Sequence, residues 1–170
     1  MDGTHEYKGY RIDIIQDDYY GHENEGDDIF IIANHRNVYV TKEGFNPVDV
    51  YEHCKPTYKG YHALPLYAYI HSGVSLSLTP FSCVWDSCQV GYVMVKREKG
   101  WSWRHDKAFG IAQSFIKSYN DVLEGNVWGY RIYKGDEELD SCWGYVGDSE
   151  FALQDAMSSV NYYVNNKEVA

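Results

Sequence analysis

The sequence lacks long apolar runs and an excess of basic residues. No stretch approaches the roughly 18 consecutive apolar residues that a helix needs to cross a bilayer. Residues 1–6 are polar and acidic, whereas a signal peptide begins basic and then becomes apolar. The chain has 15 Lys and Arg residues and 25 Asp and Glu residues. The resulting net charge of −10 disfavours non-specific electrostatic binding to nucleic-acid phosphates or to an anionic membrane. We therefore expect a cytoplasmic protein with no membrane partner and no direct nucleic-acid partner.

The common catalytic signatures are missing as well. The sequence has no Gly-rich phosphate loop, no His-Glu-x-x-His helix and no nucleophile elbow. Its four cysteines are Cys54, Cys83, Cys88 and Cys142, and in a reducing compartment we expect small apolar side chains rather than disulfides. The sequence therefore predicts no cofactor and no resident metal ion, and it favours a protein that is not an enzyme.

Aromatic residues, in contrast, are abundant. Tyr, Trp and Phe make up 16% of the chain, and hydrophobic residues make up 44%. This much apolar surface can offset the conformational entropy lost on folding, which excludes a disordered chain. The 170 residues fit one hydrophobic core with about two layers of secondary structure. We expect a single domain over residues 1–170, with the acidic loop 16–28 included in it.

Hydrophobic periodicity predicts strands that follow one another in the chain and two long amphipathic helices. Consecutive strands indicate antiparallel pairing, so the expected fold class is α+β: a twisted antiparallel sheet with two principal helices packed on one face. Strands are predicted at 10–15, 29–33, 38–41, 61–77 with an interruption at Pro65, 89–95, 127–133 and 139–146; helices are predicted at 47–53, at 108–123 and from Asp148 or Ser149 to Val164.

The acidic residues concentrate in two terminal segments. Residues 1–28 sum to −7 and residues 126–170 to −5, whereas residues 29–125 sum to +2. If the two ends of the chain lie together, these segments form one acidic face. A Ca²⁺ loop is the alternative for the first segment, although its carboxylates do not keep the EF-hand spacing. The candidate partner-binding residues are Asp17, Asp18, Glu23, Glu25, Asp27, Asp28, Asp136, Glu137 and Glu138.

The segment 71–89 mixes short polar residues with large aromatic ones, which predicts a shaped loop. One interpretation is a small-ligand pocket, in which Phe81 and Trp85 stack on a flat ring while polar neighbours fix its edges. Another is that the Asp-Ser pairs simply cap strand ends. The candidate ligand-binding residues are His71, Phe81, Ser82, Trp85, Asp86, Gln89 and Trp143.

Two further interpretations of the same segment involve its cysteines. Cys83 or Cys142 could act as a nucleophile if His71 and Asp86 converge on it. Zinc would need Cys83 and Cys88 plus a second pair of ligands. The sequence offers that second pair among His53, Cys54, His71, His105 and Cys142.

Two short motifs each occur twice. Gly-Tyr-Arg-Ile stands at 9–12 and at 129–132, and Asp-Ser-Cys stands at 86–88 and at 140–142. The distance between the two motifs differs from one copy to the other, which argues against a duplicated domain. The repeats indicate either similar strand chemistry or neighbouring strands that line one site.

The central and C-terminal segments contain distinctive motifs at residues 64–67, 71–77, 79–83, 85–87, 89–92, 118–130 and 140–145. With these motifs the chain resembles a family of uncharacterised proteins from phages, plasmids and their bacterial hosts. The resemblance covers roughly residues 60 to 150, and it implies a mobile-element context without an activity. Position 88 is typically Gly in that family, so Cys88 speaks against an essential Cys83–Cys88 metal pair. The helix that follows is also shorter and less basic here.

The sequence therefore favours a non-enzymatic phage or mobile-element accessory protein. In this hypothesis it binds and inhibits a host defence or nucleic-acid-acting protein, whose basic surface the carboxylates occupy as nucleic acid would. The alternatives are a protein that binds or sequesters a nucleotide-like small ligand in segment 71–89, and an enzyme that depends on Cys and His.

Overall fold

The computed structural model describes residues 3–18, 26–54, 57–83, 85–101 and 106–168. Over these ranges the chain forms three helices and nine strands, and the strands make two antiparallel sheets. We expected one domain, but the chain divides into two compact units, which we call unit 1 (residues 1–21 and 121–170) and unit 2 (residues 22–120). The α+β class with antiparallel strands is confirmed, and each sheet carries one of the two long helices. No helix in the described ranges is both long and apolar enough to span a membrane.

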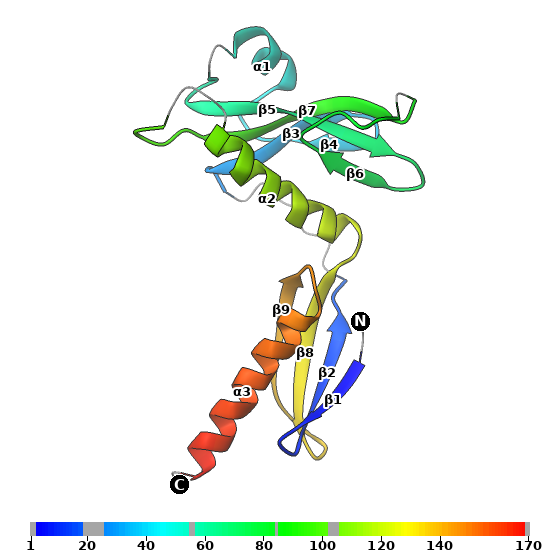
Figure 1. Cartoon of the computed structure of the whole chain (residues 1–170), viewed down its shortest axis with the longest axis vertical. Helices are drawn as coiled ribbons and strands as arrows, with labels where there is room; N and C mark the ends of the chain where they lie inside the picture. The colour runs from blue at the N-terminus through cyan, green and yellow to red at the C-terminus, as the bar shows by residue number, and fades with distance from the viewer. Residues whose placement is uncertain (1–2, 19–25, 55–56, 84, 102–105, 169–170) are drawn as a thin grey trace. The chain divides into compact units, whose positions relative to one another are not determined.

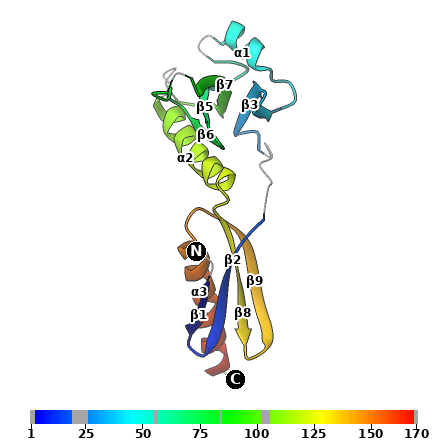
Figure 2. The ribbon, with the colours of Figure 1, turned by 90° about the vertical axis from the view of Figure 1, so that its right-hand side faces the viewer.

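Unit 1 is a four-stranded sheet with one helix on one face. The strand order is β1-β2-β8-β9, so a hairpin from the start of the chain pairs with a hairpin from its last third. Helix α3 lies along one side of this sheet (Figures 1 and 2). The elements are β1 (Gly3–Tyr7), β2 (Tyr10–Gln16), β8 (Val127–Lys134), β9 (Glu137–Val146) and α3 (Glu150–Glu168).

Local sequence explains these elements. Lys8 and Gly9 both have positive φ, which is the tight-turn geometry that matches the twist of a two-residue hairpin. The Asp148 side chain accepts a hydrogen bond from the backbone N–H of Glu150 and so caps α3, close to the predicted start. Alternate residues of β2 and β8 face α3 and form the core of the unit. The buried members of this core are Tyr10, Ile12, Ile14, Tyr130, Ile132, Ala152, Ala156 and Val160.

Unit 2 is a five-stranded antiparallel sheet in the order β4-β3-β7-β5-β6. Helix α2 covers one face, and the short helix α1 packs on the other. The elements are β3 (Ile29–His35), β4 (Val38–Val40), α1 (Pro47–His53), β5 (Tyr61–Ile70), β6 (Val74–Ser77), β7 (Ser87–Lys96) and α2 (Asp106–Leu123).

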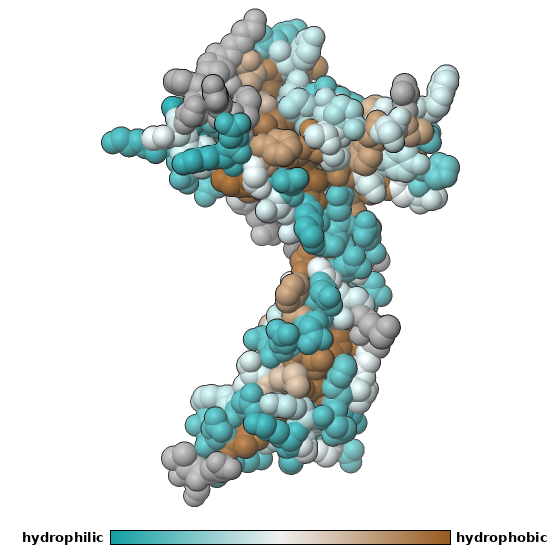
Figure 3. Space-filling model, viewed as in Figure 1, coloured by the Kyte–Doolittle hydropathy of each residue, from teal (hydrophilic) through white to brown (hydrophobic). Residues whose placement is uncertain are grey.

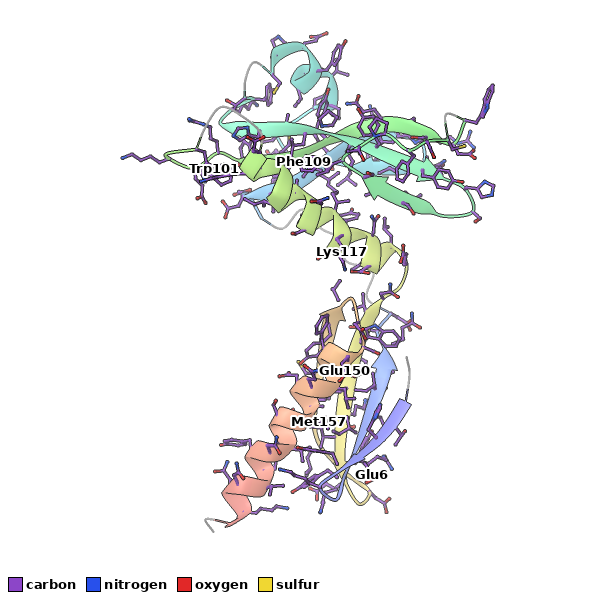
Figure 4. The ribbon with its side chains drawn as sticks, viewed as in Figure 1. Glu6, Trp101, Phe109, Lys117, Glu150 and Met157 are labelled. Atoms are coloured by element: carbon purple, nitrogen blue, oxygen red, sulfur yellow. The ribbon has the colours of Figure 1, made fainter. Side chains whose placement is uncertain are left out.

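Side chains and caps fix both helices of unit 2. Asn46 accepts a hydrogen bond from Val48 N–H and Pro47 stands at the first helical position, as expected for the start of α1. Near the end of α2, the Asn120 amide bonds both the N–H and the C=O of Leu76. This side chain therefore pairs with the backbone of the edge strand β6. Figure 4 shows Phe109 and Lys117 on α2, and Phe109 packs against the core of this face.

Three local predictions need correction. The hydrophobic pattern did not predict β1, which is a short strand of mostly polar, exposed residues, as edge strands often are. It placed a break at Pro65, but Pro65 lies within β5, and the chain turns at 71–73, where Ser72 has a positive φ. Residues 71–89 are also not one loop, because they include β6 and the start of β7. Both predicted hairpins and all three predicted helices are confirmed.

Gly91 is required by the packing of β7 against β3. A Cβ at this position would lie 1.9 Å from the carbonyl oxygen of Ile32 and 2.7 Å from the Cα of Ala33. Both atoms belong to backbone within the sheet, so they cannot move aside as a flexible side chain would. The two strands approach this closely only because residue 91 has no side chain.

We predict that Gly91→Ala lowers the free energy of unfolding by about 3 kcal/mol, because it overpacks a rigid sheet. The matched control is Gly110→Ala, on the exposed side of α2, where no atom lies within 4 Å of the added Cβ. That variant should gain roughly 0.5 to 1 kcal/mol, since Ala favours helix over Gly. Urea unfolding followed by circular dichroism measures both. Equal stability of the two variants would contradict the role of Gly91.

Candidate functional site

Part of the predicted ligand site assembles at one edge of unit 2. The β5–β6 turn carries His71, and the segment that leads into β7 carries Cys83 and Asp86. A carboxylate oxygen of Asp86 lies 3.7 Å from Nδ1 of His71 and 3.8 Å from Sγ of Cys83. Two of the predicted residues, His71 and Asp86, therefore meet, together with the cysteine proposed as a nucleophile.

The order of these three groups does not suit a cysteine nucleophile. In such a site the imidazole stands between thiol and carboxylate, takes the thiol proton and is itself oriented by the acid. Here the carboxylate stands between the other two, and the thiol of Cys83 donates its hydrogen bond to Asp86. Cys142 belongs to unit 1, whereas His71 belongs to unit 2. This geometry does not favour His71-assisted catalysis at Cys83.

The aromatic members of the predicted site lie in different surroundings. Phe81 contacts the ring of Tyr69 at 5.6 Å between centroids, and Tyr69 in turn lies 6.2 Å from the His71 ring. Ser82 is exposed nearby. The side chain of Trp85 is 96% exposed, and Trp143 belongs to unit 1. The structure thus brings Phe81 and His71 to one aromatic row and leaves Trp85 open to solvent.

Gln89 lies at a different place, in a shallow groove beside α1. The groove has a volume of about 300 Å³, and two tyrosine rings and two side-chain amides line it. Burial raises the pKa of the Tyr92 hydroxyl, and a hydrogen bond with Gln89 acts in the opposite direction. The groove is lined by Asn34, Pro47, Val48, Tyr51, Gln89, Val90, Gly91 and Tyr92.

The cysteines proposed as zinc ligands have separate partners. Sγ of Cys83 contacts Asp86, whereas Sγ of Cys88 lies 3.7 Å from Nε2 of His35. Burial raises the pKa of the Cys54 thiol, which disfavours the thiolate that binds a metal. His105 lies outside the described residues. Exposed donors of Asp49, Glu52 and His53 lie within 4.8 Å of one another on α1, a common arrangement of polar side chains that does not by itself indicate an ion.

The predicted acidic residues do not share one place. Asp27 and Asp28 belong to unit 2 and pair with Lys42 at 2.9 Å and Lys96 at 3.8 Å; the Lys42 hydrogen bond lowers the pKa of the Asp27 carboxyl. In unit 1, the predicted acids stand at opposite ends of the sheet. Asp17 and Asp18 follow the end of β2 beside the start of β8, whereas Asp136, Glu137 and Glu138 are at the β8–β9 hairpin. Glu23 and Glu25 lie outside the described residues.

At the first of these ends the structure adds four carboxylates that sequence reasoning missed. The N–H of Asp17 donates a hydrogen bond to the C=O of Val127. The residue before Val127 is Asn126, whose backbone N–H donates to the C=O of Asp121. The side-chain amide of Asn126 donates to the carboxylates of Asp121 and Glu124. Asn126 O also accepts from Gly147 N, next to the cap of α3. We call this set the acidic end: Asp17, Asp18, Asp121, Glu124, Asp148 and Glu150. Figure 4 shows Glu150 at this end of unit 1 and Glu6 toward the opposite one.

The basic side chains of unit 1 have their contacts elsewhere. Lys8 stacks on Tyr7, while Lys134 and Lys167 stack on Tyr10, near the turns at the other end of the sheet. The two arginines of the unit contact aromatic rings of β8 and β9. Unit 1 contains 15 acidic and 5 basic residues, and unit 2 contains 10 of each, so the whole net charge of −10 belongs to unit 1. Figure 3 shows hydrophilic side chains over much of unit 1.

The repeated Gly-Tyr-Arg-Ile motifs lie on neighbouring strands. β2 and β8 pair directly, with Ile12 opposite Ile132, and both arginines point to the face away from α3. There Arg11 stacks on Tyr133 at 4.2 Å and Arg131 lies 5.5 Å from the Trp143 ring. The Asp-Ser-Cys copies instead belong to different units.

A cluster of tyrosine hydroxyls and carboxylates lies between β9 and α3. The hydroxyl of Tyr145 donates to Asp155, and that of Tyr163 donates to Asp140 at 3.0 Å. Burial and the neighbouring carboxylate raise the pKa of both hydroxyls. These two bonds join β9 to α3, and each gives a carboxylate of the charged unit a hydrogen-bond donor.

The chain matches no family model, no curated protein and no solved structure. The assignment of function therefore rests on the residues and geometry described above.

The raised pKa of Tyr145 predicts alkaline sensitivity. The folded state binds this proton more tightly than the unfolded chain, so the contribution is complete below the unfolded pKa near 10 and is lost as pH rises above it. We expect the free energy of unfolding to fall between about pH 9 and about pH 11, and to fall less in Tyr145→Phe. Urea titrations at the two pH values measure this.

The control is Tyr162→Phe, a 68% exposed tyrosine on α3. Between the two pH values, the free energy of unfolding of this variant should fall as much as that of the unsubstituted protein. An unchanged loss in Tyr145→Phe would show that the Tyr145–Asp155 bond does not couple folding to pH.

Proposed function

We propose that this chain is a non-enzymatic accessory protein of a phage or mobile element, acting in the cytoplasm of a bacterial host. It binds and inhibits a host defence or nucleic-acid-acting protein by placing carboxylates on that protein's basic surface. The resemblance given above supplies the mobile-element context. The acidic end of unit 1 is the observation that carries the binding role.

The acidic end has a cost for folding, which argues for a role in binding. Asp121 lies in the last turn of α2, and Glu124 follows that turn directly. The helix dipole is negative at this end, and the last turn contains no basic residue. Each carboxylate there costs about 0.3 to 1 kcal/mol at low salt. The six carboxylates at this end also repel one another, and the N-terminus of α3 offsets this only for Asp148 and Glu150. A basic partner surface reduces both penalties on binding.

The physical basis of the proposed contact is electrostatic. Carboxylates presented together can replace phosphates in a basic channel. Such charge contacts raise the association rate and the specificity more than they raise the affinity. Exposed charges are screened within about 8 Å at physiological ionic strength, so the affinity must fall steeply with salt.

We predict that neutralising the acidic end abolishes capture of the partner. The test variant is Asp17→Asn with Asp18→Asn and Glu124→Gln. The tagged chain is incubated with nuclease-treated bacterial lysate at about 50 mM salt, and bound proteins are eluted first with a short DNA duplex and then with about 500 mM salt. We expect a nucleic-acid-acting protein in the duplex eluate of the starting chain and none with the variant. The captured protein, once purified, should lose activity when the starting chain is added.

The matched control removes an equal number of negative charges at the opposite end of the sheet, with Asp136→Asn, Glu137→Gln and Glu138→Gln. This variant should capture the partner as the starting chain does. Equal capture by the acidic-end variant, or capture that neither duplex nor salt reverses, would contradict the proposal.

A second candidate function is binding of a nucleotide-like ligand, and the groove beside α1 favours it. Two tyrosine rings with two side-chain amides can stack on a base and hydrogen-bond its edge, and 300 Å³ lies at the lower limit for small-ligand sites.

A nucleotide that binds this groove should raise the melting temperature, and Gln89→Ala should remove the shift. Gln113→Ala, an exposed glutamine on α2, is the control and should leave the shift intact. A panel of purine and pyrimidine nucleotides without any shift would eliminate this candidate.

A further inference from the structure

A cysteine and a histidine that the sequence analysis did not connect meet in unit 2. His35 stands at the end of β3 and Cys88 near the start of β7, and these strands are neighbours in the sheet. Nε2 of His35 lies 3.7 Å from Sγ of Cys88. Both residues are half-buried, and Cys88 also packs against the apolar core under α2.

The other nitrogen of this ring fixes where the proton sits. The backbone N–H of Asn37 donates to Nδ1 of His35 at 3.2 Å, so Nδ1 acts as the acceptor. A neutral imidazole has one N–H and one acceptor nitrogen, which places the N–H on Nε2, facing the sulfur. An N–H directed at sulfur stabilises the thiolate, because the anion is the better hydrogen-bond acceptor.

The other cysteines lack this arrangement. The thiol of Cys83 donates a hydrogen bond to a carboxylate, and no imidazole N–H is directed at it. Burial raises the pKa of Cys54, so it is held as a thiol. Cys142 is exposed, beside Tyr145. Cys88 alone among the described cysteines has an imidazole N–H directed at it.

We propose that Cys88 and His35 form a reactive-thiol site that takes soft electrophiles, namely peroxides and alkylating carbon centres. The thiol proton leaves to solvent, and Nε2–H of His35 donates to the sulfur anion. With iodoacetamide, sulfur attacks the methylene carbon, the C–S bond forms, the C–I bond breaks and iodide leaves. With hydrogen peroxide, the S–O bond forms and the O–O bond breaks. Sulfur is oxidised to the sulfenic acid, peroxide is reduced, and the departing hydroxide takes up the released proton as water.

This site is independent of the acidic end, because it uses other residues in the other unit and requires no basic partner. It also differs from the catalysis considered for Cys83, since the imidazole here contacts the sulfur directly. Cys83 and Cys88 are five positions apart in the chain, but they differ in the group that contacts the sulfur: a carboxylate at Cys83 and an imidazole at Cys88.

The test is competitive labelling of the full-length protein with a limiting amount of iodoacetamide at about pH 7, followed by peptide mapping of all four cysteines. Cys88 should react about tenfold faster than Cys83 and faster than the exposed Cys142. His35→Gln should lower the rate at Cys88 about tenfold, and His71→Gln, beside Cys83, is the control that should not. Dilute hydrogen peroxide, trapped with a sulfenic-acid probe, should give the same order of sites.

A second measurement separates thiolate stabilisation from a change in packing. At about pH 10 free thiols are largely ionised, so the starting protein and His35→Gln should react at equal rates at Cys88. A rate difference that persists there would mean that His35 controls access to the sulfur, and it would overturn the proposal. Cys88 reacting no faster than Cys83 at about pH 7, or no effect of His35→Gln, would overturn it as well.

Discussion

The pairing of β2 with β8 is the contact on which the organisation of unit 1 depends. It joins residues 11–16 to residues 128–133 across all of unit 2, so its formation must offset the closure entropy of a long intervening segment. Burial of Ile12, Ile14, Tyr130 and Ile132 against α3 supplies the compensating stabilisation. The same pairing brings Asp17 to Val127 and thereby assembles the acidic end.

Unit 1 therefore combines a small core with a charge of −10, and the structure shows how part of this repulsion is relieved. Tyrosine hydroxyls bind Asp140 and Asp155, and Arg131 lies 4.0 Å from Glu138. The basic side chains of this unit contact groups outside the acidic end. Self-repulsion of this kind is a cost to the folded state that a basic partner would reduce, which connects the stability of this unit to its proposed function.

The two histidine and cysteine groups of unit 2 show that residue type alone does not decide chemistry. Cys83, Asp86 and His71 contain the ingredients of a nucleophilic site, but the carboxylate separates the other two. Cys88 and His35 have no carboxylate between them, and a backbone N–H fixes the ring proton toward the sulfur. Sequence reasoning grouped residues by proximity in the chain and so selected the first set. The second set is joined only by the pairing of β3 with β7.

Local patterns in the sequence determined the α+β class, the three helices and the hairpins at 29–41 and 127–146, because periodicity, caps such as Asn46 and turn residues such as Gly135 act over a few positions. The sequence also located the charge in the terminal segments. Tertiary structure alone decided that the strands form two sheets, that Asp17 lies at the same end as Glu124 rather than Glu137, and that His35 meets Cys88. Each of these depends on which strands pair and in what register, and register is set by burial and packing between segments that are distant in the chain.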